Sequence, residues 1–214
     1  MPGKNIVREF DENGYYHIYN RGVERRSIFL DEQDYRVFLS YLKLNLSPID
    51  EIEKISPSQK LKNYFGKADL LCYCLMPNHY HMLVKQYSTT AITGLIRSIS
   101  TKYAMYFNKK YRRTGHLFQG VYRSVTVGSE AQLLHLSRYI HRNPDPTGSN
   151  PVGLAEYRYS SLQNYLGKIK QTWIKNEEIT VLFSPSDIRN SYQSFVFESA
   201  DLSDMSSMLI DYDD

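Results

Sequence analysis

Two histidines separated by one residue, His79 and His81, stand at the start of an apolar run. If that run is a β-strand, alternation places both imidazoles on one face of the sheet and Tyr80 on the other. Two imidazoles on one face can bind the same divalent metal ion. A pair of strand histidines that are exposed or hydrogen-bonded fits the same residues, so this motif alone leaves both interpretations open.

A second candidate group lies in the later segment LSRYIHRNP. Tyr139 and Asn143 are four residues apart near the end of a predicted helix, so they share one face. A phenol is a nucleophile that can accept a phosphoryl group, and an amide oxygen suits Mg²⁺ or Mn²⁺ better than Zn²⁺. For this segment alone the structural interpretation is the stronger one, with Tyr139 in the core and Asn143 capping the helix before Pro144.

The elements that must position these groups follow from periodicity and turn residues. Strands are predicted at residues 15–20, 69–76, 79–85 and 117–127. Helices are predicted at residues 31–46, over about twenty residues after the strand that contains His79 and His81, and from Ser129 to the residue before Pro144. Pro77 and Asn78 join the middle strands as a hairpin. The order is that of a ferredoxin-like α+β fold (βαββαβ), an antiparallel sheet with helices on one face, followed by the helix that carries Tyr139.

The chain length of 214 residues leaves room for one domain with a modest extension. We expect residues 1–145 to form the ferredoxin-like domain, because the turn-rich run DPTGSNP follows Asn143. Short helices are expected in a C-terminal extension at residues 146–200. Residues 201–214 are expected to form an acidic, mobile tail.

The formal net charge of +3 conceals an asymmetry along the chain. Residues 70–129 contain eight lysines and arginines and no acidic residue, whereas residues 176–214 contain nine acids and one arginine. The basic stretch favours nucleic acid as a partner, although a solvated basic face without a partner stays open. The longest apolar run, residues 70–76, is too short for a membrane span, and no secretory signal is present, so we expect a cytoplasmic protein with no membrane partner.

Five ordered blocks of sequence resemble one family. The segments MPNHYHMLV, RTGHLFQGVYRS and YIHRNP, with the long basic helix between the first two, are similar to the IS200-like HUH single-tyrosine DNA transposases. The segments YHIYNRGVERRSIFLDEQDYRVFLSYL and YRYSSLQNYLG are similar to the REP-associated tyrosine transposase branch of that family. The resemblance covers roughly residues 15–168.

The resemblance implies a site and a reaction. His79 and His81 match the family's metal ligands, Asn143 matches the third ligand, and Tyr139 matches the nucleophile. The implied ion is Mg²⁺ or Mn²⁺. The implied reaction is cleavage of single-stranded DNA beside a folded hairpin, which leaves a 5′-phosphotyrosine and a free 3′ hydroxyl that can reverse the attack. His135 and His141, which share the helix of Tyr139, are expected at the surface or against DNA.

The resemblance and the charge map agree on the DNA-binding residues. The residues expected to contact phosphates are Arg97, Lys102, Lys109, Lys110, Arg112, Arg113 and Arg123. Asn20 and Arg21, in the NRG turn after the first strand, match a family block and are also expected to reach DNA. The implied partner is single-stranded DNA with REP-like hairpins, in a bacterial protein that associates with the nucleoid when bound. The long C-terminal part favours a monomer over a homodimer.

A second function from another class stays open. A ferredoxin-like module could bind single-stranded nucleic acid without catalysis, with aromatic side chains stacking on the bases. Such a module usually exposes aromatic residues on its two central strands. This chain has two histidines on one face of the central hairpin instead, which favours the enzyme.

Overall fold

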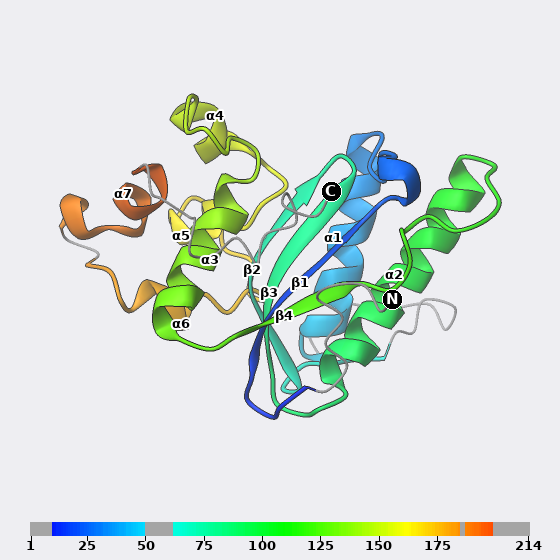
Figure 1. The fold of residues 1–214 in the computed structure, drawn as a ribbon, viewed down its shortest axis with the longest axis horizontal. Helices are drawn as coiled ribbons and strands as arrows, with labels where there is room; N and C mark the ends of the chain where they lie inside the picture. The colour runs from blue at the N-terminus through cyan, green and yellow to red at the C-terminus, as the bar shows by residue number, and fades with distance from the viewer. Residues whose placement is uncertain (1–9, 50–61, 185–186, 199–214) are drawn as a thin grey trace.

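The computed structural model of the protein describes residues 10–49, 62–184 and 187–198 (Figure 1). Four strands form one antiparallel sheet in the order β2-β3-β1-β4. The strands are β1 (Tyr15–Arg21), β2 (Ala68–Met76), β3 (His79–Gln86) and β4 (Arg123–Val127). This arrangement confirms the predicted α+β fold, and it places the histidine strand β3 between β2 and β1 in the interior of the sheet.

Helices α1 (Glu32–Leu46) and α2 (Ala91–Lys110) pack on one face of the sheet. A capping box begins α1, because the side chain of Asp31 accepts from the backbone of Asp34 and the side chain of Asp34 accepts in return. The apolar stripe predicted on α2 is buried throughout: Ile92, Leu95, Ile96, Ile99, Tyr103 and Phe107. We call the cluster beneath these helices the α1/α2 core; Ile18, Tyr80 and Met82 enter it from the sheet.

Helix α3 (Glu130–Arg142) covers the opposite face. It begins at Ser129, whose side chain accepts a hydrogen bond from the backbone of Gln132, as the sequence predicts. Leu136 and Ile140 of α3 pack against Cys72 of β2 and Leu83 of β3 in a second apolar cluster, the α3 core. The odd-numbered residues of β3 therefore face α3, and the even-numbered ones face α1 and α2.

The C-terminal segments pack beside α3 and along β2. They contain α4 (Pro151–Glu156), α5 (Leu162–Tyr165), α6 (Glu177–Thr180), the 3₁₀ turn η4 (Ile188–Asn190) and α7 (Tyr192–Phe197). The backbone of Leu75 donates to Tyr159, and that of Lys175 donates to Leu70, so the edge strand β2 is hydrogen-bonded to this part of the chain. The boundaries at residues 145 and 200 remain predictions, and the acidic tail lies outside the described residues.

The structure corrects one predicted strand. The predicted strand at 117–127 begins only at Arg123. Gly120 has a φ of 105°, which extended backbone does not adopt, and Leu117 and Phe118 are both buried although they are neighbours. Residues 117–122 instead form a loop tied to the end of β1, with the backbone of Val23 donating to Leu117 and that of Gln119 donating to Arg21.

No helix in the described part of the chain combines the length and the apolar character that crossing a membrane requires.

Candidate active site

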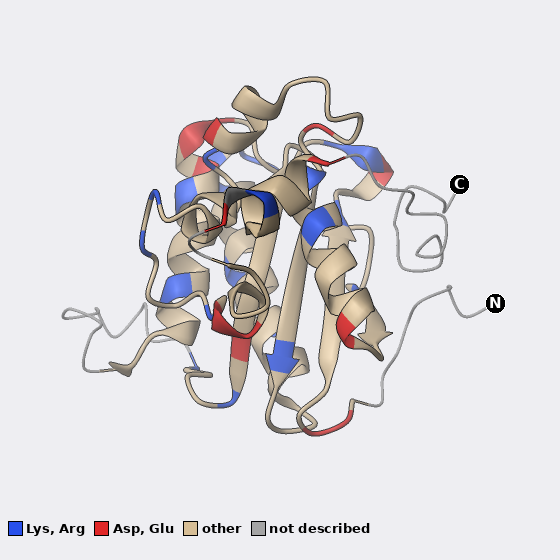
Figure 2. Cartoon of the chain, turned by 90° about the vertical axis from the view of Figure 1, so that its left-hand side faces the viewer, with Lys and Arg blue, Asp and Glu red and all other residues tan. Residues whose placement is uncertain are grey.

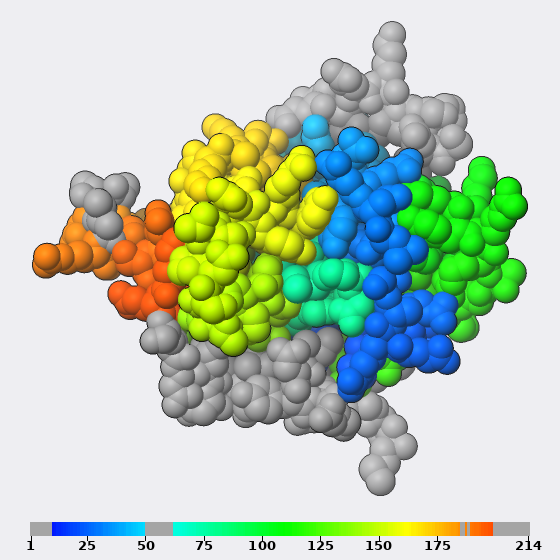
Figure 3. Space-filling model, turned by 90° about the horizontal axis from the view of Figure 1, so that it is seen from above, coloured from blue at the N-terminus to red at the C-terminus, as the bar shows by residue number. Residues whose placement is uncertain are grey.

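The predicted ligands His79 and Asn143 meet in the structure. His79 begins β3 directly after the hairpin turn, and Asn143 is the C-cap of α3. Figure 3 shows the teal segment around the β2–β3 hairpin beside the yellow-green end of α3. The Nε2 atom of His79 lies 2.9 Å from the Oδ1 atom of Asn143, and its Nδ1 atom lies 2.7 Å from the Oδ1 atom of Asn78. The packing of α3 on β2 and β3 thus brings two distant segments to one point.

The second histidine of the motif, His81, lies beside the first and is completely buried. The ring centroids of His79 and His81 are 5.0 Å apart. The Nδ1 atom of His81 lies 2.9 Å from the Nε2 atom of His17, whereas its Nε2 atom has no hydrogen-bond partner among the described residues. Burial, together with the proximity of His17 and His79, holds the pKa of His81 well below its usual range. His81 is therefore a neutral imidazole, the form that binds metal.

These residues fit a hard divalent cation. Both ring nitrogens of His79 face amide oxygens. In the neutral form that binds metal, His79 carries one proton, so only one of these two contacts would then be an ordinary hydrogen bond. Neighbouring ligands of an octahedral Mg²⁺ lie about 3 Å apart, because each bond is about 2.0–2.1 Å long. The separation of His79 Nε2 and Asn143 Oδ1 matches that spacing, and the buried Nε2 atom of His81 supplies a further lone pair.

Histidine, cysteine and carboxylate side chains alone do not make up a metal site within the described ranges of the chain. Among the residues that the structure describes, no group of three or more histidine, cysteine, aspartate or glutamate side chains could hold a metal ion. A metal site built on the two histidines would therefore need the amide of Asn143 as a further ligand, and an oxygen ligand of this kind suits Mg²⁺ or Mn²⁺.

Tyr139, the predicted nucleophile, lies one helical turn before Asn143 on α3. Its side chain is 7% exposed and packs partly in the α3 core. The ring is nearly perpendicular to two imidazoles, with its centroid 5.4 Å from that of His81 and 6.2 Å from that of His17. The phenol ring therefore lies between the α3 core and the imidazoles of His17 and His81.

The expectation that His141 lies at the surface or against DNA is wrong. His141 is completely buried, and its ring nitrogens lie 2.7 Å from the hydroxyl of Tyr192 and 2.8 Å from that of Ser161. Burial lowers the pKa of His141 to about 3, so it is neutral. It joins α3 to α7 and to the C-terminal segment before α5. His135, on the same helix, is half-buried, with its Nδ1 atom 2.7 Å from the guanidinium of Arg138.

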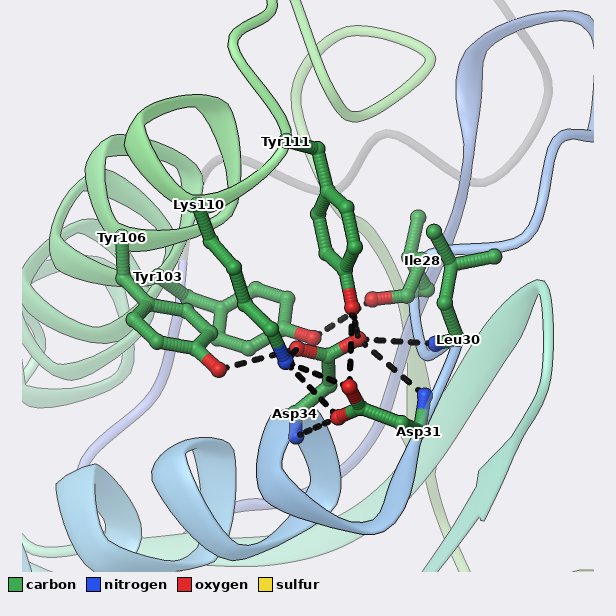
Figure 4. Close-up of polar contacts among 8 residues, drawn as sticks. All are labelled: Ile28, Leu30, Asp31, Asp34, Tyr103, Tyr106, Lys110 and Tyr111. Atoms are coloured by element: carbon green, nitrogen blue, oxygen red, sulfur yellow. Dashed lines mark hydrogen bonds and ion pairs between the residues drawn. The ribbon is translucent and has the colours of Figure 1, made fainter.

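Lys110, one of the predicted phosphate contacts, instead joins α2 to α1 (Figure 4). Its ammonium donates to both oxygens of Asp31 at 2.7 Å and to Asp34 at 2.8 Å. The Asp34 side chain is completely buried and also accepts hydrogen bonds from Tyr106 and Tyr111. Two carboxylates already compensate the charge of Lys110, so it is less suited to a phosphate contact than the exposed cations are.

The other predicted DNA-binding side chains fall into two groups. Arg97, Lys109 and Arg112 are exposed, whereas Lys102, Arg113 and Arg123 are half-buried. Arg113 donates to the side chain of Asn108 at 3.0 Å. Seen from the side of α3, lysines and arginines are spread over several elements (Figure 2).

Asn20 and Arg21 hold the turn after β1 in place. The side chain of Asn20 is buried; it accepts from the backbone of Arg21 at 2.9 Å and donates to the carbonyl of Gly120 at 3.3 Å. Arg21 is half-buried and donates to the side chain of Gln119. Both residues therefore shape the loop before β4.

Sequence analysis did not single out His17. A signal was available, because the ferredoxin-like order places β1 beside β3 and His17 lies two residues from Tyr19, the Cα partner of His81. The side chains of His17 and His81 therefore had to lie on the same face, as diagonal neighbours.

The chain resembles a known protein family over more than half of its length. The profile of the family described as "Transposase IS200 like" matches residues 11–143. A solved structure of a REP-associated tyrosine transposase bound to a REP hairpin is 14% identical, with a TM-score of 0.55 over 82% of this chain and 98% of that chain, which shows a shared fold. A search of curated proteins gave no significant match.

Two further solved structures are similar only at a level that carries no argument. A putative transposase from Deinococcus radiodurans has a TM-score of 0.37 and 16% identity over 66% of this chain and 96% of that chain. The tRNA(His) guanylyltransferase of Saccharomyces cerevisiae has a TM-score of 0.39 and 12% identity over 92% of this chain and 81% of that chain. The family match spans more than half of the sequence and includes His79, His81, Tyr139 and Asn143, and the chain therefore belongs to the IS200-like transposases.

Proposed function

We propose that this transposase cleaves single-stranded DNA beside a hairpin and transfers the strand through a 5′-phosphotyrosine on Tyr139, in a reaction that depends on Mg²⁺ or Mn²⁺. The observation that carries the proposal is a convergence of groups. His79 Nε2 and Asn143 Oδ1 lie 2.9 Å apart, and the Tyr139 ring stands against His81, whose buried Nε2 atom has no partner among the described residues.

The metal ligands in this proposal are His79 and His81, each through Nε2, and Asn143 through Oδ1. Asn78 accepts the Nδ1 proton of His79 and so leaves the lone pair on Nε2. A bound divalent ion would polarise the scissile phosphate and stabilise the negative charge that develops on its oxygens.

Tyr139 supplies the nucleophile. A phenol has an ordinary pKa near ~10, so it must lose its proton as the new bond forms. Its oxygen attacks the phosphorus, the bond from phosphorus to the 3′ oxygen breaks, and the leaving 3′ oxygen takes up a proton. The phosphotyrosine conserves the energy of the bond, so a 3′ hydroxyl can later attack it and rejoin a strand without a nucleotide cofactor.

DNA binding in this proposal rests on the exposed cations Arg97, Lys109 and Arg112, with Lys102, Arg113 and Arg123 beside them. Asn20 and Arg21 would act by shaping the loop before β4. Hairpin DNA is proposed as the partner because the solved relative of similar fold is bound to a REP hairpin. A monomeric state and a cytoplasmic, nucleoid-associated location remain predictions.

The test is a covalent adduct assay with the full-length protein. A single-stranded oligonucleotide that contains a hairpin and labelled 3′ flank is incubated with Mn²⁺, and denaturing gels detect protein joined to the labelled strand. We expect an adduct with the wild-type protein and with Tyr41→Phe, a half-buried tyrosine of α1. We expect none with Tyr139→Phe.

Two outcomes would contradict the proposal. An adduct that persists in Tyr139→Phe would move the nucleophile to another residue. Tight binding of the hairpin without any adduct, in the wild-type protein as in the variant, would support the non-catalytic binding module instead.

A further inference from the structure

His17 is a completely buried histidine on β1. Its side chain lies on the α3 face of the sheet, because Tyr16 and Ile18 on either side of it enter the α1/α2 core. The Nε2 atom of His17 lies 2.9 Å from the Nδ1 atom of His81, and the two rings are stacked with centroids 5.1 Å apart. The Tyr139 ring is nearly perpendicular to both imidazoles, with its centroid 6.2 Å from that of His17 and 5.4 Å from that of His81.

The hydrogen bond between the two histidines restricts where the protons are. A histidine that binds metal through Nε2 must carry its proton on Nδ1. His81 would then donate from Nδ1, and the Nε2 atom of His17 would accept. His17 must consequently carry its own proton on Nδ1. If His81 binds a metal ion through Nε2, this one hydrogen bond therefore fixes the tautomers of both rings.

The surroundings of His17 suit it to accept a hydrogen bond from His81 and not to bind the metal ion itself. Its Nε2 atom is directed at the Nδ1 atom of His81, on the side of that ring away from the Nε2 atom without a hydrogen-bond partner. Pairing of β1 with β3 through Tyr19 and His81 fixes the separation of the two strands. The acceptor is thus built into the sheet and does not depend on a mobile side chain.

We propose that His17 is a positioning residue, which holds His81 in the Nδ1–H tautomer and in the ring orientation that presents Nε2 to a divalent cation. The inference rests on the proposed function, since it takes His81 as a metal ligand. Outer partners of metal-bound histidines typically change metal affinity about 10–100-fold when they are removed. A histidine that only fills the interior would change stability and leave metal affinity unchanged.

The first measurement is Mn²⁺ affinity of the full-length protein without DNA, by titration with detection of free Mn²⁺ by electron paramagnetic resonance. His17→Phe keeps a flat ring but removes the acceptor, and we expect the dissociation constant to rise about 10–100-fold. His17→Gln offers an amide oxygen as acceptor, and we expect it to restore affinity to within about threefold of wild type. Ile18→Ala weakens the same strand from its opposite face and is the matched control, with an unchanged dissociation constant.

The second measurement is independent of the variants and of metal. Nitrogen-15 chemical shifts of the imidazoles distinguish the two neutral tautomers in the metal-free wild-type protein. We expect His81 to carry its proton on Nδ1 and His17 to carry its proton on Nδ1 as well. An Nε2–H tautomer of His81 would overturn the inference even if His17→Phe failed to fold.

The outcomes separate the inference from the function on which it rests. If the wild-type protein binds Mn²⁺ and His17→Phe binds it equally well, the positioning role is refuted and the metal site stands. If Ile18→Ala loses as much affinity as His17→Phe, the effect belongs to strand stability and the inference is overturned. If the wild-type protein binds no Mn²⁺, the proposed metal site fails, and the role of His17 falls with it.

Discussion

The Nε2 atom of His79 and the Oδ1 atom of Asn143 lie 2.9 Å apart, although 64 residues separate them in the chain. The distance depends on two local features, a hairpin turn that places His79 at the first position of β3 and a helix, α3, whose C-cap is Asn143. It also depends on the α3 core, because Leu136 and Ile140 set the height of α3 above the sheet. The site is therefore as rigid as the packing beneath it.

Substitutions of Asn143 should show whether this residue binds the metal ion or only caps helix α3. Asn143→Ala removes the amide oxygen, so we expect Mn²⁺ affinity to fall at least about tenfold. Asn143→Asp replaces the amide by a charged oxygen ligand, and we expect it to bind Mn²⁺ at least as tightly as the wild-type protein. Titration with Mn²⁺ measures both variants. Equal affinity in all three proteins would remove Asn143 from the ligand set.

Lys110 should matter for stability, and its neighbour Lys109 for DNA. Lys110→Gln leaves the buried carboxylate of Asp34 without its cation, so we expect the free energy of unfolding to fall by about 2 kcal/mol. We expect its affinity for hairpin DNA to stay within about twofold of wild type. Lys109→Gln should show the reverse, with weaker DNA binding, a smaller salt dependence and unchanged stability. Urea unfolding and DNA titration at two salt concentrations test both, and weaker DNA binding in Lys110→Gln would contradict the assignment.

The network around Asp34 predicts how stability varies with pH. Burial opposes the charged form, but hydrogen bonds from Lys110 and from the backbone of Leu30 outweigh it and lower the pKa of Asp34 from its ordinary value of 3.8. A carboxyl with a lowered native pKa stabilises the fold fully above its unfolded pKa, and this contribution is lost as the pH falls through the native value. Asp34→Asn should therefore cost most at pH 7, and progressively less below about pH 4. Urea unfolding of both proteins at pH 7, 5 and 3 measures the difference, and a constant difference would refute the role of the charge.

His141 should hold the C-terminal segments to α3. His141→Phe removes a partner of Tyr192 and of Ser161. Tyr192 keeps its hydrogen bond to Ser137, and Ser161 keeps two to the backbone of Tyr73, so we expect a loss of about 1–2 kcal/mol in the free energy of unfolding. His135→Gln, on the same helix but half-buried, keeps an acceptor for Arg138 and should change stability by less than about 0.5 kcal/mol. Thermal and urea unfolding test the pair. Equal effects at both positions would show that His141 has no special role.

The parts of the fold that depend on local pattern could be predicted from sequence. The stripe from Ile92 to Phe107 recurs at helical spacing, and Pro77 and Asn78 stand between two apolar runs, so α2 and the β2–β3 hairpin follow from the residues themselves. Alternation along β3 then places His79 and His81 on one face. That these two histidines lie near Tyr139 and Asn143 could be predicted only from the family resemblance.

The parts that depend on distant contacts could not be predicted in this way. The pattern from Leu117 to Val127 predicts one strand, but hydrogen bonds to the end of β1 hold its first part, residues 117–122, in a loop. His141 resembles a surface histidine until the segments that contain Ser161 and Tyr192 cover it. Lys110 belongs to a basic stretch of sequence, and only the packing of α2 on α1 brings it to two carboxylates.

The alternation of side chains along β3 determines which substitutions this strand can tolerate during evolution. Tyr80 and Met82 fill the α1/α2 core, whereas His79 and His81 border the proposed site. In a library with every substitution at residues 79–82, the effects should therefore alternate along the strand. We expect substitutions at positions 80 and 82 to lower protein abundance, and substitutions at positions 79 and 81 to lower strand-joining activity. A single histidine replacement in this segment would then remove a proposed metal ligand while the residues that fill the α1/α2 core stay in place.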